Sequence, residues 1–302
     1  MIVQQKQHLG WILVGAVACA CWGISGIFAK ALFAAAPGMT AFTLTQMRMV
    51  TSGVMTLLLA QFTGHHPLRM LATGRSIRQA LVYGIVGLVP NQLFYFLAVQ
   101  YGNAAIATIL QFVGPFFIML YMAVVHRERP SRLELISAVV AFFGVVVVAT
   151  NGRFTHLALT IPVLVFGLLS AVGAMTDTLT PRPLMDRFGS LEITGWGLLI
   201  GGIVLTAIHP QLPAVHVTGA VVGWFTLIVV VGTIFPFVAY TTTLRHVSPT
   251  VTGLLDAFEP LAATAGSVLF MGLHLTPALL VGSLLIIVAV MGLSYQPRKE
   301  RR

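Results

Sequence analysis

The sequence predicts an all-α integral membrane protein, with ten transmembrane helices arranged as two inverted five-helix repeats. Composition is the first observation: of 302 residues, 57% are hydrophobic and only 8% are charged. A soluble domain carries about 25% charged residues, so a soluble fold of this length would lack the polar surface it needs. The second observation is a series of long apolar runs. The third is a similarity between the two halves of the chain.

Ten apolar runs, each close to the roughly 20 residues that cross a bilayer, are separated by short polar breaks. They cover residues 10–30, 40–61, 77–99, 103–125, 132–150, 157–177, 191–208, 218–242, 248–271 and 276–295. No break is long enough for a soluble domain, so any functional site must lie in or beside the bilayer. The first run follows Lys6 and resembles a signal peptide, but its length favours an uncleaved membrane helix.

The distribution of Lys and Arg predicts the orientation of the helices, with both termini in the cytoplasm. With the N-terminus inside, the outside breaks carry only Arg153, while Lys30 and Arg48 fall in or at the edge of spans. The cytoplasmic pieces carry all other cations: Lys6, Arg69, Arg75, Arg78, Arg127, Arg129, Arg132, Arg182, Arg187, Arg245, Arg298, Lys299, Arg301 and Arg302. The net charge of +9 is therefore a topology signal. We expect a multi-pass protein of the cell (cytoplasmic) membrane, surrounded by lipid, with no nucleic-acid partner.

The two halves of the chain resemble each other when the sequence is shifted by 145 residues. The shift pairs Pro115 with Pro260, Tyr95 with Tyr240, Ser25 with Ser170, and Gln111 with Asp256, and it brings Pro90 one residue from Pro236. We expect the repeats to be residues 1–150 and 151–302. Because five spans is an odd number, the second repeat would enter the membrane inverted. Such repeats are typical of secondary transporters, whose substrate site lies near the midplane between the halves.

The stretch GLLDAFEPLAATAG places Asp256 and Glu259 near the middle of a predicted span. A charged side chain there costs roughly 2.5–3.5 kcal/mol on insertion scales, so such residues usually face a polar pathway or a partner. Two carboxyl groups this close would also suit proton coupling. The alternatives for Glu259 are a buried cation as its partner, or a cap for the broken backbone near Pro260.

Gln111 and Asp256 each lie four residues before a proline, so each repeat presents a polar side chain and a proline on one helix face. A contact that only joins helices is the alternative reading for Gln111. Asn91 and Tyr95 share one face of the third span, and we expect both in the pathway. Tyr95 and Tyr240 are the aromatic residues expected there, because the repeat matches them; most phenylalanines are expected in the core or against lipid.

Trp22, Ser25 and Ser170 complete the predicted substrate pathway, the two serines because the repeat pairs them. Pro115 and Pro260 are expected to have a structural role, since a proline in a membrane helix frees backbone groups that neighbouring side chains can bind.

Two cations and one further acid lie in or at the ends of spans. We expect Arg48, about eight residues into the second span, to form a structural ion pair more often than to bind a ligand. Lys30 is expected to reach the outer interface with its long side chain. Asp177 closes the sixth span, either as an interfacial end or at a cavity mouth. Cys19 and Cys21 are two apart on one helix, so they are expected to pack rather than to bridge.

Several motifs resemble a known family. Trp22-Gly23 followed by Lys30 looks like a WG…K opening, and Arg48 matches an arginine that usually occupies the second span. The run QFVGPFFIMLYMAVVHRERPS has the family's pattern of a proline followed by Glu128, and FEPLAATAGSVLFMG begins with its Glu-Pro pair. Along essentially the whole chain, this ordered set resembles the EamA-type transporters of the drug/metabolite transporter (DMT) superfamily.

The resemblance implies ten helices in two inverted repeats, with both termini cytoplasmic. It implies a central cavity lined by the first, third, fourth, sixth, eighth and ninth spans, and export of small metabolites, often amino acids or related compounds. One departure is clear: Gly272 is followed by Leu273 and His274 where the family usually has a Glu. An ion pair at the end of that helix is therefore in doubt.

We predict a secondary transporter and not an enzyme. The open alternatives are a gradient-independent facilitator, an importer, a membrane enzyme acting on lipid-linked substrates, and a sensor or scaffold. The short loops lack the clusters of acids or histidines that an enzyme would need. His65-His66 has no ligand spacing, so we expect no metal ion, and no motif indicates a cofactor. An aromatic substrate is a guess from ring content.

Overall fold

The computed structural model describes residues 2–127, 129–153, 157–185, 187–211, 215–243, 246 and 255–294, and the regular secondary structure in these ranges is helical. Up to residue 150 the elements are α1 (Ile2–Ala35), α2 (Ala41–Phe62), the 3-10 helix η1 (Pro67–Ala72), α3 (Gly74–Val82), the π-helix η2 (Tyr83–Leu88), α4 (Val89–Tyr101), α5 (Ala104–Gln111), α6 (Gly114–Val125) and α7 (Arg132–Thr150). Beyond it are α8 (Ile161–Leu179), α9 (Arg182–Met185), α10 (Ser190–Ile208), α11 (Gly219–Val229), the π-helix η3 (Val230–Ile234), α12 (Phe235–Thr243), α14 (Phe258–Met271) and α15 (Pro277–Ser294).

Each of the ten predicted apolar runs contains a helix. Within the described ranges, seven helical stretches are long and apolar enough to cross a membrane: Gly10–Ala35, Gly74–Tyr101, Ala104–Val125, Arg132–Thr150, Ile161–Met185, Ser190–Ile208 and Gly219–Tyr240. The helices α14 and α15 are apolar but shorter. The helix α2 is long enough but falls outside the seven, because Arg48 and its other polar residues lower its hydropathy.

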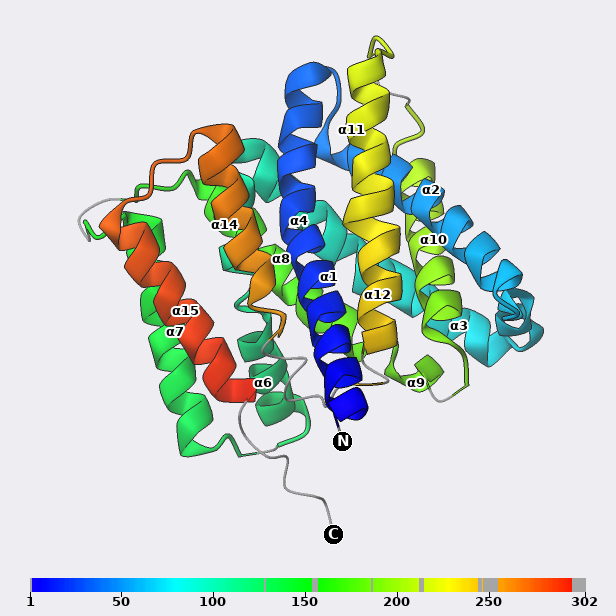
Figure 1. Ribbon diagram of the computed structural model, residues 1–302, viewed down its shortest axis with the longest axis horizontal. Coiled ribbons are helices and arrows are strands. Elements are labelled where there is room, and N and C mark those ends of the chain that lie inside the picture. Colours follow the sequence, from blue (N-terminus) through cyan, green and yellow to red (C-terminus); the bar gives the residue numbers. More distant parts are fainter. Residues whose placement is uncertain are drawn as a thin grey trace.

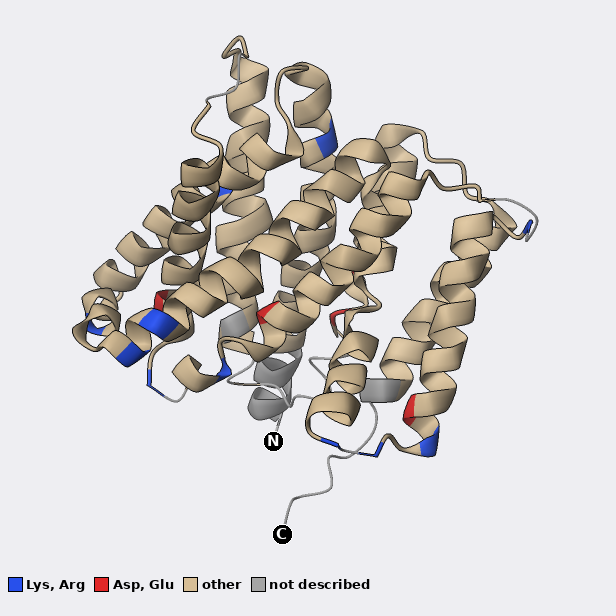
Figure 2. Ribbon diagram, turned by 180° about the vertical axis from the view of Figure 1, so that it is seen from behind, with Lys and Arg blue, Asp and Glu red and all other residues tan. Residues whose placement is uncertain are grey.

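The surface of the bundle is apolar in the way that a lipid-facing surface requires. Phe142 on α7, Leu269 and Phe270 on α14, and Leu284 on α15 are all exposed. Lys and Arg of the described residues lie mostly along one edge, the lower one in Figure 2. Five of the predicted cytoplasmic cations lie outside the described residues, namely Arg245 and the four C-terminal ones. Glu128 lies outside them as well.

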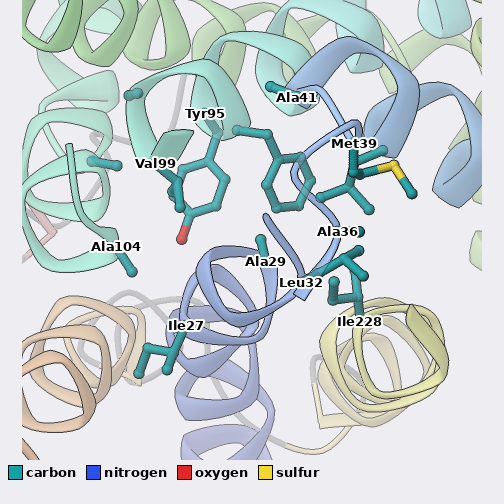
Figure 3. Close-up of a cluster of buried hydrophobic side chains, with 14 of the residues drawn as sticks. Ile27, Ala29, Leu32, Ala36, Met39, Ala41, Tyr95, Val99, Ala104 and Ile228 are labelled. Carbon is teal, nitrogen blue, oxygen red and sulfur yellow. The ribbon is translucent and has the colours of Figure 1, made fainter. Parts of the chain in front are cut away.

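Two pairs of helices flank a central group. The helix α7 packs against α15 at one end of the molecule, and α2 packs against α10 at the other (Figure 1). Between them, α1 packs against both α12 and α14, and α4 packs against α8. A buried apolar cluster around α1 includes Leu32, Tyr95 and Ile228, and Figure 3 shows part of it.

Four of the apolar stretches are interrupted in the middle of the bundle. The π-helices η2 and η3 each come just before a helix with a proline in its first turn, Pro90 in α4 and Pro236 in α12. A proline has no N–H and clashes with the preceding turn, which a wider π-turn accommodates. Turns also separate α5 from α6 before Pro115, and occupy residues 256–257 before α14 and its Pro260. These interruptions place polar side chains and free backbone groups where continuous helices would not.

Candidate functional site

A cavity of about 460 Å³ lies in the middle of the bundle, at the helix interruptions. It is lined from both halves of the chain. Eight of the nine predicted pathway residues line it, together with two of the predicted structural residues: Trp22, Ser25, Asn91, Tyr95, Gln111, Tyr240, Asp256 and Glu259, and Arg48 and Pro115. A concave site with a mostly apolar lining and a few converging polar groups is the usual form of a small-molecule site.

One side of the cavity, which we name the acid wall, consists of Tyr240, Asp256 and Glu259. The hydroxyl of Tyr240 donates to Oδ1 of Asp256 at 2.7 Å, and the thiol of Cys19 approaches the same oxygen at 3.7 Å. Asp256 sits in the turn before α14, so its side chain belongs to the break and not to a regular helix. In the described part of the chain, no side chain or backbone group donates to the carboxyl group of Glu259.

Close backbone packing brings Glu259 to the cavity. Gly23 on α1 touches the first turn of α14, and a Cβ at this position would overlap the carbonyl oxygen of Glu259. The neighbouring residue on α1 is Trp22, which therefore lies beside the acid wall. The Trp-Gly pair of the first span thus has a physical reason: the glycine permits the approach, and the tryptophan forms the wall of the cavity next to it.

A second polar group of the cavity lining, which we name the amide wall, consists of Asn91, Gln111 and Asp177. Nδ2 of Asn91 donates to Oδ2 of Asp177 at 2.8 Å, and Oδ1 of Asn91 accepts from Nε2 of Gln111 at 2.7 Å. A close contact between α8 and α4 sets this geometry, since a Cβ at Gly173 would overlap the backbone of Asn91. Asp177 lies one turn further along α8, and so reaches the Asn91 side chain.

Aromatic rings also line the cavity. The ring of Trp22 lies 5.1 Å from that of Tyr240 and 5.3 Å from that of Phe237, both in tilted or edge-on geometry. Tyr95 is buried, and its hydroxyl forms a 3.1 Å hydrogen bond with that of Thr108. The cluster around Trp22 offers both apolar area and ring faces, which are negative and attract cations.

Arg48 lines the cavity and has neutral partners in the described part of the chain, instead of the expected carboxylate. Its Nε donates to the Thr233 hydroxyl at 2.6 Å, Nη1 to the Gln92 side chain at 2.7 Å, and Nη2 to the Gly232 carbonyl at 3.1 Å. Its guanidinium also lies 4.9 Å from the centre of the Phe96 ring. A buried charge is tolerable only with such hydrogen bonds, and here they join α2, α4 and the π-helix η3.

Lys30, expected at the outer interface, is half-buried and binds backbone. Its ammonium group donates to the carbonyl oxygens of Val99, Gln100 and Gly102, at 3.3, 3.2 and 2.8 Å. These are the groups left free where α4 ends, and a cation at that position also interacts favourably with the helix dipole. Lys30 therefore fixes the end of α4 and lies outside the cavity.

The structure does not bring Ser170 to the cavity. Its side chain is fully buried, and its hydroxyl donates to the Gly167 carbonyl of its own helix at 2.7 Å. Its repeat partner Ser25 does line the cavity, so the repeat predicts the position of the residue but not its exposure. Pro260 is buried in the first turn of α14 and does not line the cavity.

Sequence reasoning missed several lining residues, among them Gln92, Thr194 and Phe237, and left Asp177 undecided between two places. Asp177 was open between an interface and a cavity mouth, and the structure places it in the cavity wall. An acid in an apolar run is the signal that favours that choice. Gln92 follows Asn91 and binds Arg48; Phe237 lies in an apolar run, and Thr194 near the start of another, with no local signal. Among the described residues, no three His, Cys, Asp or Glu side chains are placed to hold a metal ion.

Comparison with known proteins shows the family of the chain. The model of the EamA-like transporter family matches residues 9–150 and 161–295. The chain belongs to the EamA-like transporter family. The chain is thus a multi-pass membrane transporter of the EamA/DMT type.

The transporter aligns with its relatives over most of the length of both chains. It is 28% identical over 288 residues to "Uncharacterized inner membrane transporter YicL" of Salmonella typhimurium, covering 95% of both chains. It is 27% identical over 299 residues to "Threonine/homoserine exporter RhtA" of Escherichia coli K12, covering 96% of this chain and 92% of that one. A solved structure named only "Crystal structure of protein" has a TM-score of 0.64 over 94% of this chain and 96% of its own, at 19% identity, which supports the fold alone. The relatives are transporters, which points away from an enzyme.

Proposed function

We propose that this transporter exports small metabolites, amino acids or related compounds, across the cytoplasmic membrane by alternating access. One observation carries the proposal: the 460 Å³ cavity lies between interrupted helices contributed by both halves of the chain. Interrupted membrane helices are typical of transporter sites, because polar backbone is tolerated at that depth only where it lines a cavity or is buried in protein.

The arrangement of helices supports two inverted repeats, residues 1–150 and 151–302, with ten transmembrane segments. The π-helices η2 and η3 stand at matching places, and so do the turns after α5 and before α14. Exchanging each segment for its partner in the other half also keeps the main contacts: α4 with α8 corresponds to α12 with α1, and α6 with α8 corresponds to α14 with α1. The family model matches two consecutive ranges, which agrees with such a duplication.

The cation-rich edge of the bundle is proposed to face the cytoplasm, with the N-terminus on that side. The positive-inside bias supports this orientation, because the described cations gather along that edge in Figure 2. Alternating access would then require the two repeats to rock around the cavity, so that the substrate site opens to each side in turn.

Export of amino acids is supported by RhtA, a threonine/homoserine exporter that resembles this chain over nearly its whole length. Protons are the proposed coupling ion. Carboxyl groups inside a membrane protein commonly serve proton relays, and Asp256 and Glu259 both line the cavity. A facilitator that needs no gradient, and an importer, are the rival modes that the experiment must separate.

The test is an efflux assay with purified protein in liposomes loaded with labelled amino acids and amines. Efflux is followed with and without a pH gradient, for the wild type and for Asp256→Asn, which keeps the shape of the side chain. Faster efflux of one compound, with dependence on both the gradient and Asp256, would support a proton-coupled exporter. Efflux that ignores both would make the protein a facilitator, and Asp256 a structural acid. A compound accumulated from outside would establish uptake.

A further inference from the structure

The cavity has an excess of acidic side chains. Asp177, Asp256 and Glu259 line it, and Arg48 is the one Lys or Arg among the described residues that line it. Arg48 is buried, and its Nε, Nη1 and Nη2 atoms each donate to the protein. The guanidinium therefore joins helices, and three of its five N–H donors already bind the protein.

The amide wall presents an acceptor to the cavity. A carboxylate oxygen only accepts, so Asn91 must turn its NH₂ group to Asp177 and its carbonyl oxygen to Gln111. Gln111 must then donate through Nε2, which leaves its Oε1 as the acceptor that no described residue binds. Asp177 thus acts through Asn91 to fix the polarity of Gln111, as a positioning residue.

The acid wall also presents acceptors. Oδ1 of Asp256 is bound by the Tyr240 hydroxyl and the Cys19 thiol, while no described residue donates to its Oδ2 or to the carboxyl group of Glu259. Carboxyl groups in an apolar setting are costly unless they are paired and hydrogen-bonded. A ligand with several N–H donors and a positive charge would supply what both walls lack.

The rings beside the acid wall suit the same ligand. Trp22, Phe237 and Tyr240 line the cavity, with ring centres 5.1 and 5.3 Å from that of Trp22. Tryptophan and tyrosine faces bind ammonium groups as well as apolar surface. Acceptors on both walls, an excess of carboxyl groups over cationic side chains and an aromatic cluster therefore occur in one cavity.

We propose that the substrates of this transporter are organic cations: protonated amines with an apolar or aromatic body and no carboxylate. The inference rests on the transport of small metabolites proposed above, and selects amines over amino acids as the substrate class. The ammonium group would lie between Gln111, Asp256 and Glu259, and the body against Trp22 and Tyr240. An amino-acid zwitterion is disfavoured, because its carboxylate would face an acidic wall while the guanidinium of Arg48 is already bound.

The test is equilibrium binding to the purified full-length protein in detergent at neutral pH, measured by calorimetry. Four ligands share one ring and differ in charge: 2-phenylethylamine, phenylalanine, 3-phenylpropionate and 2-phenylethanol. The amine is expected to bind at least about tenfold more tightly than the other three, as one or two charge-assisted hydrogen bonds provide. Equal or tighter binding of phenylalanine or the alcohol, or no binding of the amine, would overturn the proposal.

The variants Asp256→Asn and Glu259→Gln are expected to weaken amine binding by about tenfold each and to leave binding of the alcohol unchanged. Glu134→Gln is the matched control: Glu134 caps the start of α7 outside the cavity, and Gln can replace it in that role. Each variant must elute from size-exclusion chromatography as a single species of the wild-type size. If one of the two acid variants fails to fold, the other still tests the proposal. Unchanged amine binding in both variants would mean that the acids do not bind the ligand's charge.

Failure of this inference is distinguishable from failure of the transport function. Binding in detergent needs no gradient and no movement across a membrane. If liposomes export phenylalanine while the amine does not bind, transport stands and the cation class is overturned. If the amine binds but never crosses the membrane, the cation site stands and the transport proposal fails.

Discussion

The amide wall and the acid wall are built on matching parts of the two halves, but they differ in chemistry. Gln111 and Asp256 each lie at a break four residues before a proline. Gln111 is held in a chain of hydrogen bonds that ends at Asp177, whereas Asp256 has one oxygen bound by Tyr240 and Cys19, and the other without a described donor. Similar backbone geometry thus supports a hydrogen-bond network with most of its groups paired in the amide wall, and carboxyl oxygens without described donors in the acid wall.

The largest expected effect is on the close contacts that support both walls. Gly23→Val should destabilise the acid wall and Gly173→Val the amide wall, by about 2–4 kcal/mol each, because an added side chain overlaps backbone that cannot retreat. The measurement is the yield of single-species protein and its thermal unfolding midpoint in detergent. Gly223→Val is the matched control on α11, where nothing lies within 4 Å of an added Cβ. Wild-type midpoints for both glycine variants would show that the walls do not depend on these contacts.

The next effect separates the two aspartates. Asp256→Asn should lower efflux at least about tenfold with a small change in thermal midpoint, because Asp256 lines the cavity and no described residue donates to its Oδ2. Asp177→Asn should mainly lower stability. The asparagine still accepts the hydrogen bond from Asn91 but no longer carries a charge, so the free energy of unfolding should fall by about 1 kcal/mol. Efflux should fall less than for Asp256→Asn. Equal losses of efflux in the two variants would contradict the division between a positioning acid and a ligand-facing acid.

Of the two repeat-matched tyrosines, Tyr240 in the acid wall should matter more than Tyr95 for both stability and efflux. Tyr240→Phe removes a 2.7 Å donor to a carboxyl group, worth about 1.5–3 kcal/mol, while Tyr95→Phe removes a hydroxyl–hydroxyl contact, worth about 0.5–1.5 kcal/mol. Thermal midpoints of the two variants, measured in one detergent, would compare them directly. Tyr240→Phe should also reduce efflux more, because Asp256 loses the group that orients it. A larger loss for Tyr95→Phe on both measurements would reverse the comparison.

The sequence predicts the frame of this site better than its contacts. Run length and cation bias give the helical class, and the repeat gives five residues of the cavity wall, because these signals depend on periodicity and charge: Ser25, Tyr95, Gln111, Tyr240 and Asp256. The neutral partners of Arg48 do not follow from the sequence, since they come from α4 and from a π-turn near residue 230, far along the chain. The role of Asp177 also needed the structure: only the approach of α8 to α4 at Gly173 decides between interface and cavity.

The smallest expected effect is at the repeat-matched serines, where sequence similarity and structural role diverge most. Ser170→Ala removes a hydroxyl that binds a carbonyl of its own helix, so the thermal midpoint and efflux should both stay close to wild type. Ser25→Ala removes a hydroxyl from the cavity lining, and should change efflux by about two- to fivefold, as expected for a neutral hydrogen bond. Efflux rates of the two variants, each scaled to the amount of protein in the liposomes, test this. If Ser170→Ala had the larger effect on efflux, the cavity would extend further along α8 than its lining indicates, and the asymmetry between the two halves would be smaller than the two walls imply.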